Sequence, residues 1–181
     1  MATDRRDVIV VGVGIIGCLT AYLLAREGLK VTIIEADSVG SHASGFAFGG
    51  LGPLEGAGIP DPLLGFSVWC LERHASLAPE LEEASGVDTQ FHLRDRLILA
   101  FDDSEVQRAK EEIKWQKDVK GFHVEWLDQP DVLKVEPRTN PECLGASYAQ
   151  GTGAIEAYRY NLAAAQAAEK FGAEFLLRRV T

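Results

Sequence analysis

The feature that most constrains the fold is residues 7–35, where three closely spaced glycines separate an apolar strand from a helix. Val8–Val11 is a short β-branched run, typical of a parallel strand that is buried on both faces. Gly12, Gly14 and Gly17 follow in the spacing Gly-x-Gly-x-x-Gly. The first glycine permits a tight turn, the second lets a pyrophosphate approach the main chain, and the third lets the helix pack closely against the strand. The segment therefore predicts a dinucleotide-binding unit.

The residues around the glycines supply the rest of this unit. A helical pattern begins at Ile15 and ends at Gly28, a residue suited to a left-handed conformation. A second strand begins at Lys30 and ends at Glu35, whose carboxylate can accept hydrogen bonds from the hydroxyls of an adenosine ribose. The helix N-terminus would face the pyrophosphate. Further residues that we expect to bind the cofactor are Ile15, Ile16 and Ala36.

A membrane-spanning segment or a signal peptide is the alternative interpretation of the same residues. Residues 8–25 carry no charge before the arginine at position 26, and they follow Arg5 and Arg6. Three glycines and a threonine make a poor spanning helix, and no cleavage site of small residues precedes the polar, strand-like continuation. We therefore expect no transmembrane span.

Composition excludes several classes of function. The 181 residues can bury one sizeable core, and 46% hydrophobic residues with mixed charges describe a soluble globular protein. A formal net charge of -9 argues against nucleic acid as a partner, because no basic surface would offset phosphate repulsion. The three cysteines contain no Cys-x-x-Cys pair, and the four histidines show no ligand spacing. We therefore expect that the protein binds no metal. We also expect it in a reducing compartment, the cytoplasm.

The segment after Glu35 departs from the ordinary nicotinamide-binding pattern. It is rich in Gly, Ala and Ser, with glycines at positions 40, 45, 49, 50, 52, 56 and 58. Such a stretch lets the main chain run against a large flat ligand and donate N–H groups to it. A mobile surface loop is the alternative. Its place after a ribose-binding glutamate favours a flavin over a nicotinamide.

The downstream pattern predicts alternating helices and strands. Residues 63–85 are helical up to Gly86, and Pro79 is expected to kink or divide this helix. Thr89–His92 and Arg96–Phe101 predict two strands. Further expected elements are a helix at about 105–119 capped by Asp102 or Asp103, a strand at about 123–127, a short helix at about 130–134, a strand at about 144–148 and a helix at 158–171.

This order predicts an α/β fold, a Rossmann-like FAD/NAD(P)-binding domain with part of an inserted α+β domain that has a mixed or antiparallel sheet. The expected ranges are 1–85 for the first part of the nucleotide-binding domain, 86–150 for the insertion and 151–181 for the return to the first domain. Residues 174–181 predict a strand, and a doubly wound sheet needs further strands beside it. We therefore expect the N-terminal part of a longer protein.

With these motifs in place, the sequence resembles the flavin-dependent amine and amino-acid oxidoreductases of the D-amino-acid oxidase (DAO) superfamily, and within it the glycine oxidases. The resemblance spans the whole chain. It is carried by the glycine motif with Glu35, by His-Ala-Ser-Gly-Phe-Ala-Phe-Gly-Gly-Leu-Gly at 42–52, by Ser-Gly-Val-Asp at 85–88 with Leu-Ile-Leu-Ala-Phe at 97–101, and by Leu-Gly-Ala-Ser-Tyr at 144–148 followed by Gly-Ala-Ile-Glu-Ala-Tyr at 153–158 and Gly-Ala-Glu at 172–174.

The resemblance implies FAD as the cofactor and assigns it further contacts. Ser44 and Gly45 would contact the pyrophosphate or the flavin, and Val180 would meet the adenine through its backbone. Residues implied to line the isoalloxazine are Gly49, Gly50 and Leu51. Some relatives bond a histidine covalently to the flavin, but the matching position here is Ala47, so we expect non-covalent FAD.

The resemblance also implies a reaction. A hydride would pass from the Cα of a small amino acid or amine to flavin N5, giving an imino acid that hydrolyses to an oxo acid and ammonia, with oxygen reduced to hydrogen peroxide. The alternatives are a dehydrogenase of the same superfamily, acting on a D-amino acid, sarcosine or glycerol 3-phosphate and passing electrons to a quinone, and a truncated, non-catalytic nucleotide-binding module. The family's substrate-anchoring arginine and tyrosine would lie beyond residue 181, so no catalytic residue is assigned. The oligomeric state is left open, and a homo-oligomer is one alternative for the full-length protein.

Overall fold

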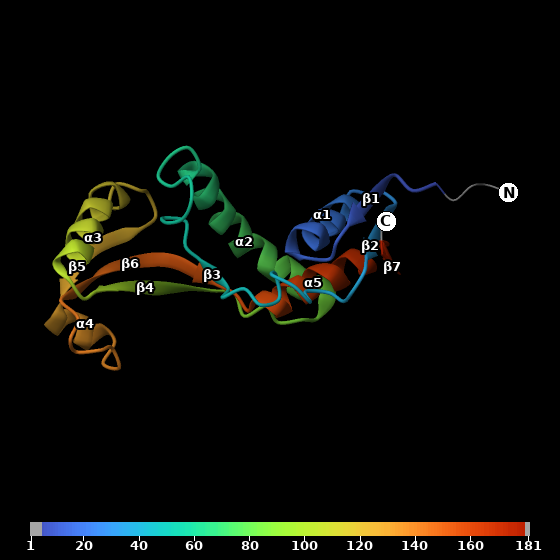
Figure 1. The fold of residues 1–181 in the computed structure, drawn as a ribbon. Helices are drawn as coiled ribbons and strands as arrows, with labels where there is room; N and C mark the ends of the chain where they lie inside the picture. Colours follow the sequence, from blue (N-terminus) through green and yellow to red (C-terminus); the bar gives the residue numbers. More distant parts are fainter. Residues whose placement is uncertain (1–4, 180–181) are drawn as a thin grey trace. The chain divides into compact units, whose positions relative to one another are not determined.

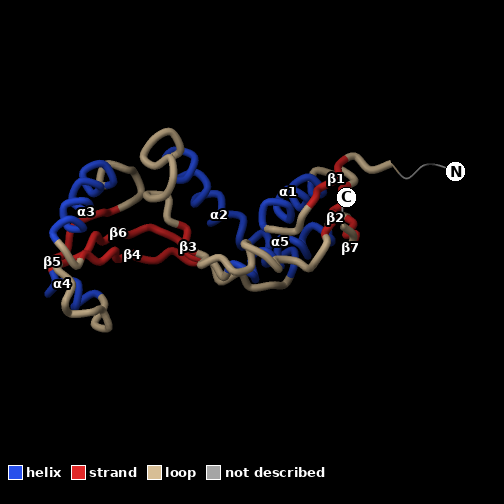
Figure 2. Tube along the Cα trace, in the orientation of Figure 1, coloured by secondary structure: helices blue, strands red, loops and turns tan. Residues whose placement is uncertain are grey.

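The structure is a computed structural model that describes residues 5–179 (Figures 1 and 2). Its main chain divides into two compact units, which are described separately. Among the described residues, unit 1 comprises 5–50, 73–91 and 155–179, and unit 2 comprises 51–72 and 92–154. The elements, in chain order, are β1 (Val8–Val11), α1 (Ile15–Arg26), β2 (Val31–Glu35), β3 (Gly50–Leu51), α2 (Leu64–Ser85), β4 (His92–Ala100), α3 (Asp103–Gln116), β5 (His123–Asp128), α4 (Gln129–Val135), β6 (Gly145–Ala154), α5 (Ala157–Lys170) and β7 (Glu174–Leu177).

Unit 1 is built on a parallel sheet of three strands in the order β1-β2-β7. In this sheet Val10 lies opposite Ile33, and Ile33 lies opposite Phe175. The main hydrophobic core of the unit joins the fully buried Ile33 to small side chains of α1 and α5, such as Ala21 and Ala164. Because these side chains are small, the two helices can pack closely against each other over the sheet. The expected strand–glycine turn–helix–strand order is confirmed.

Strand β1 differs from the expectation that both of its faces are buried. Val8 and Val10 pack against the core, whereas Ile9 and Val11 are 61% and 65% exposed. The reason is that the core built from α1 and α5 covers only the face of the strand that Val8 and Val10 occupy. The apolar run at Val8–Val11 therefore predicted the strand correctly, but the prediction that both of its faces are buried is wrong.

Helix α2 is one continuous helix with Pro79 inside it, so of the two expected effects, a kink or a division, the division is wrong and the kink stays a prediction. Proline removes a main-chain hydrogen bond from a helix and costs about 3 kcal/mol there. The buried side chains of Leu77 and Leu81 stand on either side of Pro79 in the core of unit 1, and their burial offsets this cost. The helix ends where expected, before Gly86, which has a φ of +77°.

Unit 2 is built on a second sheet, in the order β3-β6-β4 with β5 also paired to β6. Strands β4 and β5 both run antiparallel to β6. In place of the two strands expected at Thr89–His92 and Arg96–Phe101, the structure has one strand, β4, which begins only at His92 and whose register shifts between Arg94 and Arg96. Two residues of β6 that are three positions apart, and so lie on opposite faces of the strand, belong to two small cores: Ala149 packs with Leu54, and Ala146 packs with Val132 of α4.

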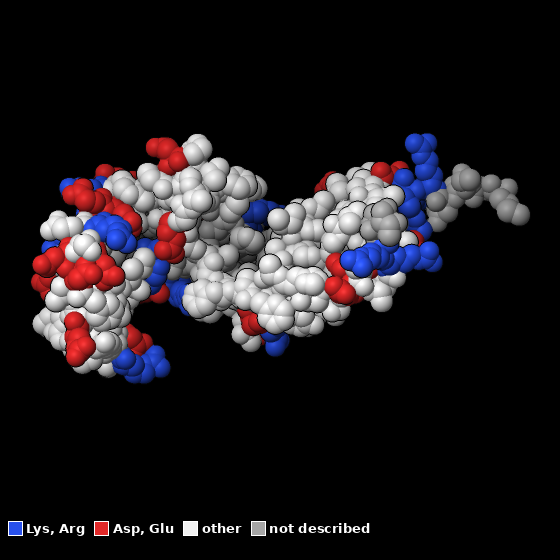
Figure 3. All heavy atoms as spheres, viewed as in Figure 1, with Lys and Arg blue, Asp and Glu red and all other residues white. Residues whose placement is uncertain are grey.

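The compact units interleave differently from the expected domain ranges of 1–85, 86–150 and 151–181. Residues 51–72 belong to unit 2, because Leu54 is buried against Val124 and Ala149, with Leu64 packed beside them. The domain ranges themselves stay predictions. On the face that Figure 3 shows, acidic and basic side chains lie interspersed over α3. Within residues 5–179, none of the helices combines the length and the apolar character that crossing a membrane requires.

Candidate dinucleotide-binding site

The glycine turn of unit 1 has the geometry that a phosphate-binding turn requires. Gly12 has a φ of +100°, which a side chain would strain, and its N–H donates to the carbonyl of Ile34 at 2.9 Å. Gly14 is the N-cap of α1 and has no side chain to cap the helix, and the N–H of Ile15, the first residue of α1, donates to Ser44 Oγ at 3.0 Å. The first turn of α1 holds no acidic residue, so the positive end of the helix dipole is available to an anion. This end of unit 1 fits a pyrophosphate.

Glu35 stands at the end of β2, beside this turn. Its Oε2 accepts the N–H of Val13 at 2.9 Å, and its Oε1 accepts those of Ala36 at 2.6 Å and Asp37 at 2.9 Å. These hydrogen bonds, the one from Asp37 above all, hold the pKa of the Glu35 carboxyl below its ordinary value. An ionised carboxylate accepts about four hydrogen bonds, so Glu35 keeps one acceptor position on Oε2 beside three main-chain donors.

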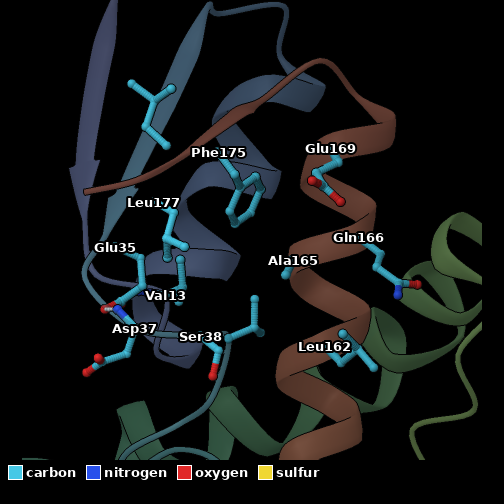
Figure 4. A pocket seen from close by; sticks show the side chains of 12 residues that line it. Val13, Glu35, Asp37, Ser38, Leu162, Ala165, Gln166, Glu169, Phe175 and Leu177 are labelled. Carbon is cyan, nitrogen blue, oxygen red and sulfur yellow. Dashed lines mark hydrogen bonds between the residues drawn. The ribbon is translucent and has the colours of Figure 1, made fainter. Parts of the chain in front are cut away.

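A cavity of about 420 Å³ lies against Glu35 within unit 1. Figure 4 shows side chains of α5 and of β7 on two of its sides, with Glu35 and Val13 at one end. This volume is in the range of small-molecule sites in proteins. The residues that line it are Val13, Glu35, Asp37, Ser38, Val39, Leu162, Ala165, Gln166, Glu169, Phe175, Leu176 and Leu177. It can hold an adenosine next to the carboxylate that would bind its ribose.

Most of these lining residues were not among the site residues expected from sequence. Leu162, Gln166 and Glu169 face the cavity from α5, more than 120 positions after Glu35. Their spacing reveals only that they share one side of a helix. No motif connects that side to the glycine turn, so only the folded chain brings the two together.

The segment rich in Gly, Ala and Ser is fastened to unit 1 at several points. Ser44 Oγ accepts the N–H of Ile15 at 3.0 Å, which places Ser44 beside the glycine turn. A Cβ on Gly45 would lie 1.9 Å from the carbonyl oxygen of Gly40, and one on Gly49 would lie 2.1 Å from that of Ile155. Glycine is therefore required at both positions by the close approach of main chain to main chain. These contacts favour a segment with a fixed main-chain path over a mobile surface loop.

The other expected residues fall in three places. Ile16 lies in the first turn of α1 with an exposed side chain, and Ala36 meets Glu35 through its N–H. Gly50 and Leu51 form β3, of which Gly50 belongs to unit 1 and Leu51 to unit 2. Val180 lies outside the described residues. Within 5–179 no group of three or more His, Cys, Asp or Glu side chains could hold a metal ion.

The lowered pKa of Glu35 predicts how stability depends on pH. The unfolded chain binds the carboxyl proton at a higher pH than the folded chain, so the stabilisation is fully present above the ordinary glutamate pKa, about 4.3, and is lost as the pH falls through the folded value. Urea unfolding of the wild type and of Glu35→Gln should therefore differ most at neutral pH and converge in acid. A difference that grows as the pH falls would contradict the assignment.

Comparisons with known proteins agree with this geometry. The profile of the DAO family, described as FAD dependent oxidoreductase, matches residues 7–181. A glycine oxidase of Geobacillus kaustophilus (strain HTA426) is 33% identical over 172 residues, which cover 94% of this chain and 45% of that protein. A D-amino acid dehydrogenase 2 of Pseudomonas aeruginosa is 38% identical over 85 residues, which cover 42% of this chain and 20% of that protein.

The fold agrees as well. The crystal structure of glycine oxidase from Geobacillus kaustophilus superimposes with a TM-score of 0.91 at 30% sequence identity, covering 96% of this chain and 47% of that one. The chain thus spans about half the length of the relatives it matches. Because the family profile covers nearly all of the sequence, the chain belongs to the DAO family of FAD-dependent oxidoreductases.

Proposed function

We propose that this chain binds FAD non-covalently and contributes the nucleotide-binding part of an enzyme that oxidises the CH–NH bond of a small amino acid or amine. The observation that carries the proposal is Glu35, which is fixed by three main-chain N–H groups between the glycine turn and the 420 Å³ cavity. Membership of the DAO family supports FAD rather than a nicotinamide dinucleotide as the ligand.

The residues present fit the adenosine diphosphate part of FAD. The open acceptor position on Glu35 suits one ribose hydroxyl, and the N-terminus of α1, which has no acidic residue in its first turn, suits the pyrophosphate. We propose Gly12, Gly14, Ile15, Ile16, Gly17 and Ala36 around these two groups, with Ser44 and Gly45 beside them and Gly49, Gly50 and Leu51 toward the flavin. Ala47 offers no nucleophile for a covalent link to the flavin.

FAD, when bound, accepts the two electrons and the hydrogen that leave the substrate carbon. The protein's part in such a reaction is to hold cofactor and substrate in a reactive orientation, which by itself can supply much of the rate. In this chain Glu35 and the glycine turn would fix the nucleotide end of the cofactor, and the segment from Ser44 to Gly49 would set the path of the main chain toward its flavin end.

Glycine or another small amino acid is the substrate class that the glycine oxidase relatives favour, with oxygen as electron acceptor and hydrogen peroxide as product. The relative named D-amino acid dehydrogenase 2 supports a second candidate, a dehydrogenase that passes electrons to a quinone. A third candidate is a nucleotide-binding module without catalysis. A cytoplasmic location remains a proposal, consistent with the three free cysteines Cys18, Cys70 and Cys143.

An absorbance spectrum of the purified chain, before and after heat denaturation and filtration, tests the cofactor. Flavin bands that move into the filtrate would support non-covalent FAD, and a chain that also fails to take up added FAD would contradict it. Anaerobic addition of amino acids then tests the reaction. Bleaching of the flavin with peroxide formation in air supports an oxidase, bleaching that needs a quinone for turnover supports a dehydrogenase, and binding without bleaching supports the module.

A further inference from the structure

A buried amide of α5 contacts the glycine turn. Asn161 is completely buried, and its Nδ2 donates to the carbonyl oxygen of Val13 at 2.9 Å, across 148 positions of sequence. The two residues belong to unit 1. Neither the glycine motif nor the helical pattern of α5 points to this contact.

The carbonyl of Val13 is the meeting point of several donors. Besides Asn161, it accepts the N–H of Gly40 at 3.3 Å and the thiol of Cys18 at 3.4 Å. Burial and the nearby Glu35 charge raise the pKa of Cys18 to about 12, so the thiol keeps its proton and can donate. The amide of Asn161 makes the shortest of the three contacts, and the thiol is a weak donor.

The direction of this carbonyl determines what the next residue presents to a ligand. A peptide group is planar and trans, so its C=O and its N–H point in opposite directions. The carbonyl of Val13 shares its peptide group with the N–H of Gly14. A donor that holds the carbonyl toward α5 therefore turns the Gly14 N–H away from α5, into the turn where a pyrophosphate would lie.

Packing alone does not explain an asparagine here. Its Oδ1 is buried and has no hydrogen-bond partner among the described residues. An unsatisfied buried acceptor destabilises the folded state, and an apolar side chain with the same branching, such as leucine, would avoid that cost. The space is also tight, because a Cβ on Gly40 would lie 3.0 Å from Nδ2. What asparagine provides at this position, and an apolar side chain does not, is therefore the N–H donor that bonds to the Val13 carbonyl.

We propose that Asn161 is a positioning residue for the cofactor: it holds the Val13–Gly14 peptide in the orientation that directs the Gly14 N–H at the FAD pyrophosphate. The inference rests on the proposed function, since it assumes FAD as the ligand of this turn. Asn161 itself does not touch the cofactor in this arrangement, because its amide lies behind the main chain that would.

Three variants test the role. Asn161→Ala removes the amide, and Asn161→Leu removes it while keeping the branching and the number of heavy atoms of the side chain. Tyr160→Phe is the matched control, since the neighbouring Tyr160 is equally buried and its hydroxyl makes a 2.8 Å hydrogen bond to His74 Nδ1 of α2 and not to the glycine turn. All three lose a hydrogen bond made by a fully buried residue, so a general effect of destabilisation would appear in each.

The two readouts are the dissociation constant for FAD and amide hydrogen exchange without FAD. We expect both Asn161 variants to bind FAD about tenfold more weakly, the factor that corresponds to one lost hydrogen bond, and the control to bind it like the wild type. The N–H groups of Val13 and Gly40 should exchange faster in the Asn161 variants than in the control.

The two readouts also separate this inference from the proposed function. If the wild type binds FAD while Asn161→Leu keeps both its affinity and its protection at Val13 and Gly40, the positioning role is overturned and the proposed function stands. If the wild type does not bind FAD, the proposed function fails for this chain, and exchange at Val13 and Gly40 still decides whether Asn161 holds the turn.

Discussion

Replacing Gly17 by alanine is expected to lower the free energy of unfolding by about 3 kcal/mol, because the new methyl group has no space between strand and helix. A Cβ at this position would lie 2.1 Å from the carbonyl oxygen of Gly12, 3.1 Å from its carbon and 3.4 Å from a methyl group of Val10. The first two atoms are main chain, so β1 and α1 would have to move apart. Urea unfolding followed by circular dichroism measures the change.

Gly14→Ala is the matched control for this prediction. Its Cβ would meet only the side chain of Ser44, with Oγ at 3.0 Å, so this one side chain has to shift by a few tenths of an ångström, which its hydrogen bond from the Ile15 N–H can accommodate. We therefore expect a stability close to that of the wild type, together with weaker FAD binding, because the methyl group would occupy the approach of the pyrophosphate. Equal stability losses in the two variants would show that the close packing at Gly17 is not what makes glycine necessary.

Replacing Glu35 by alanine is expected to weaken FAD binding about 100-fold. A hydrogen bond to a charged group contributes about 1.5–3 kcal/mol, and each 1.4 kcal/mol changes a dissociation constant tenfold. The substitution also releases the N–H groups of Val13, Ala36 and Asp37, so the turn and the strand end lose the group that holds them together. Fluorescence titration of the apoprotein with FAD measures the effect.

Asp7→Ala is the control for Glu35, because Asp7 is also a carboxylate that accepts a main-chain N–H, that of Lys30 at 2.9 Å. Asp7 precedes β1 and is not one of the residues that line the 420 Å³ cavity. We expect its FAD affinity to stay within about twofold of the wild-type value, since surface substitutions away from a site have small effects. If Glu35→Ala binds FAD as tightly as Asp7→Ala does, Glu35 is not the ribose-binding residue.

Much of unit 1 could be predicted from sequence because its signals are local. The β-branched run at Val8–Val11, the spacing of Gly12, Gly14 and Gly17 and the carboxylate at the end of the next strand lie within 28 residues. Each glycine answers a steric requirement of the backbone around it, and such requirements act over a few residues. The resemblance to the DAO family rested on the same kind of segment and is confirmed by the family match.

Only the tertiary structure decided the features that depend on which helices and strands pack against each other. Pro79 stays inside one helix because Leu77 and Leu81 are buried around it, and β1 buries one face because the core covers only one. The cavity beside Glu35 and the amide of Asn161 come from α5, whose pattern shows a helix but not its neighbour. Periodicity specifies the face that a segment buries, whereas the partner of that face is fixed by packing between distant parts of the chain.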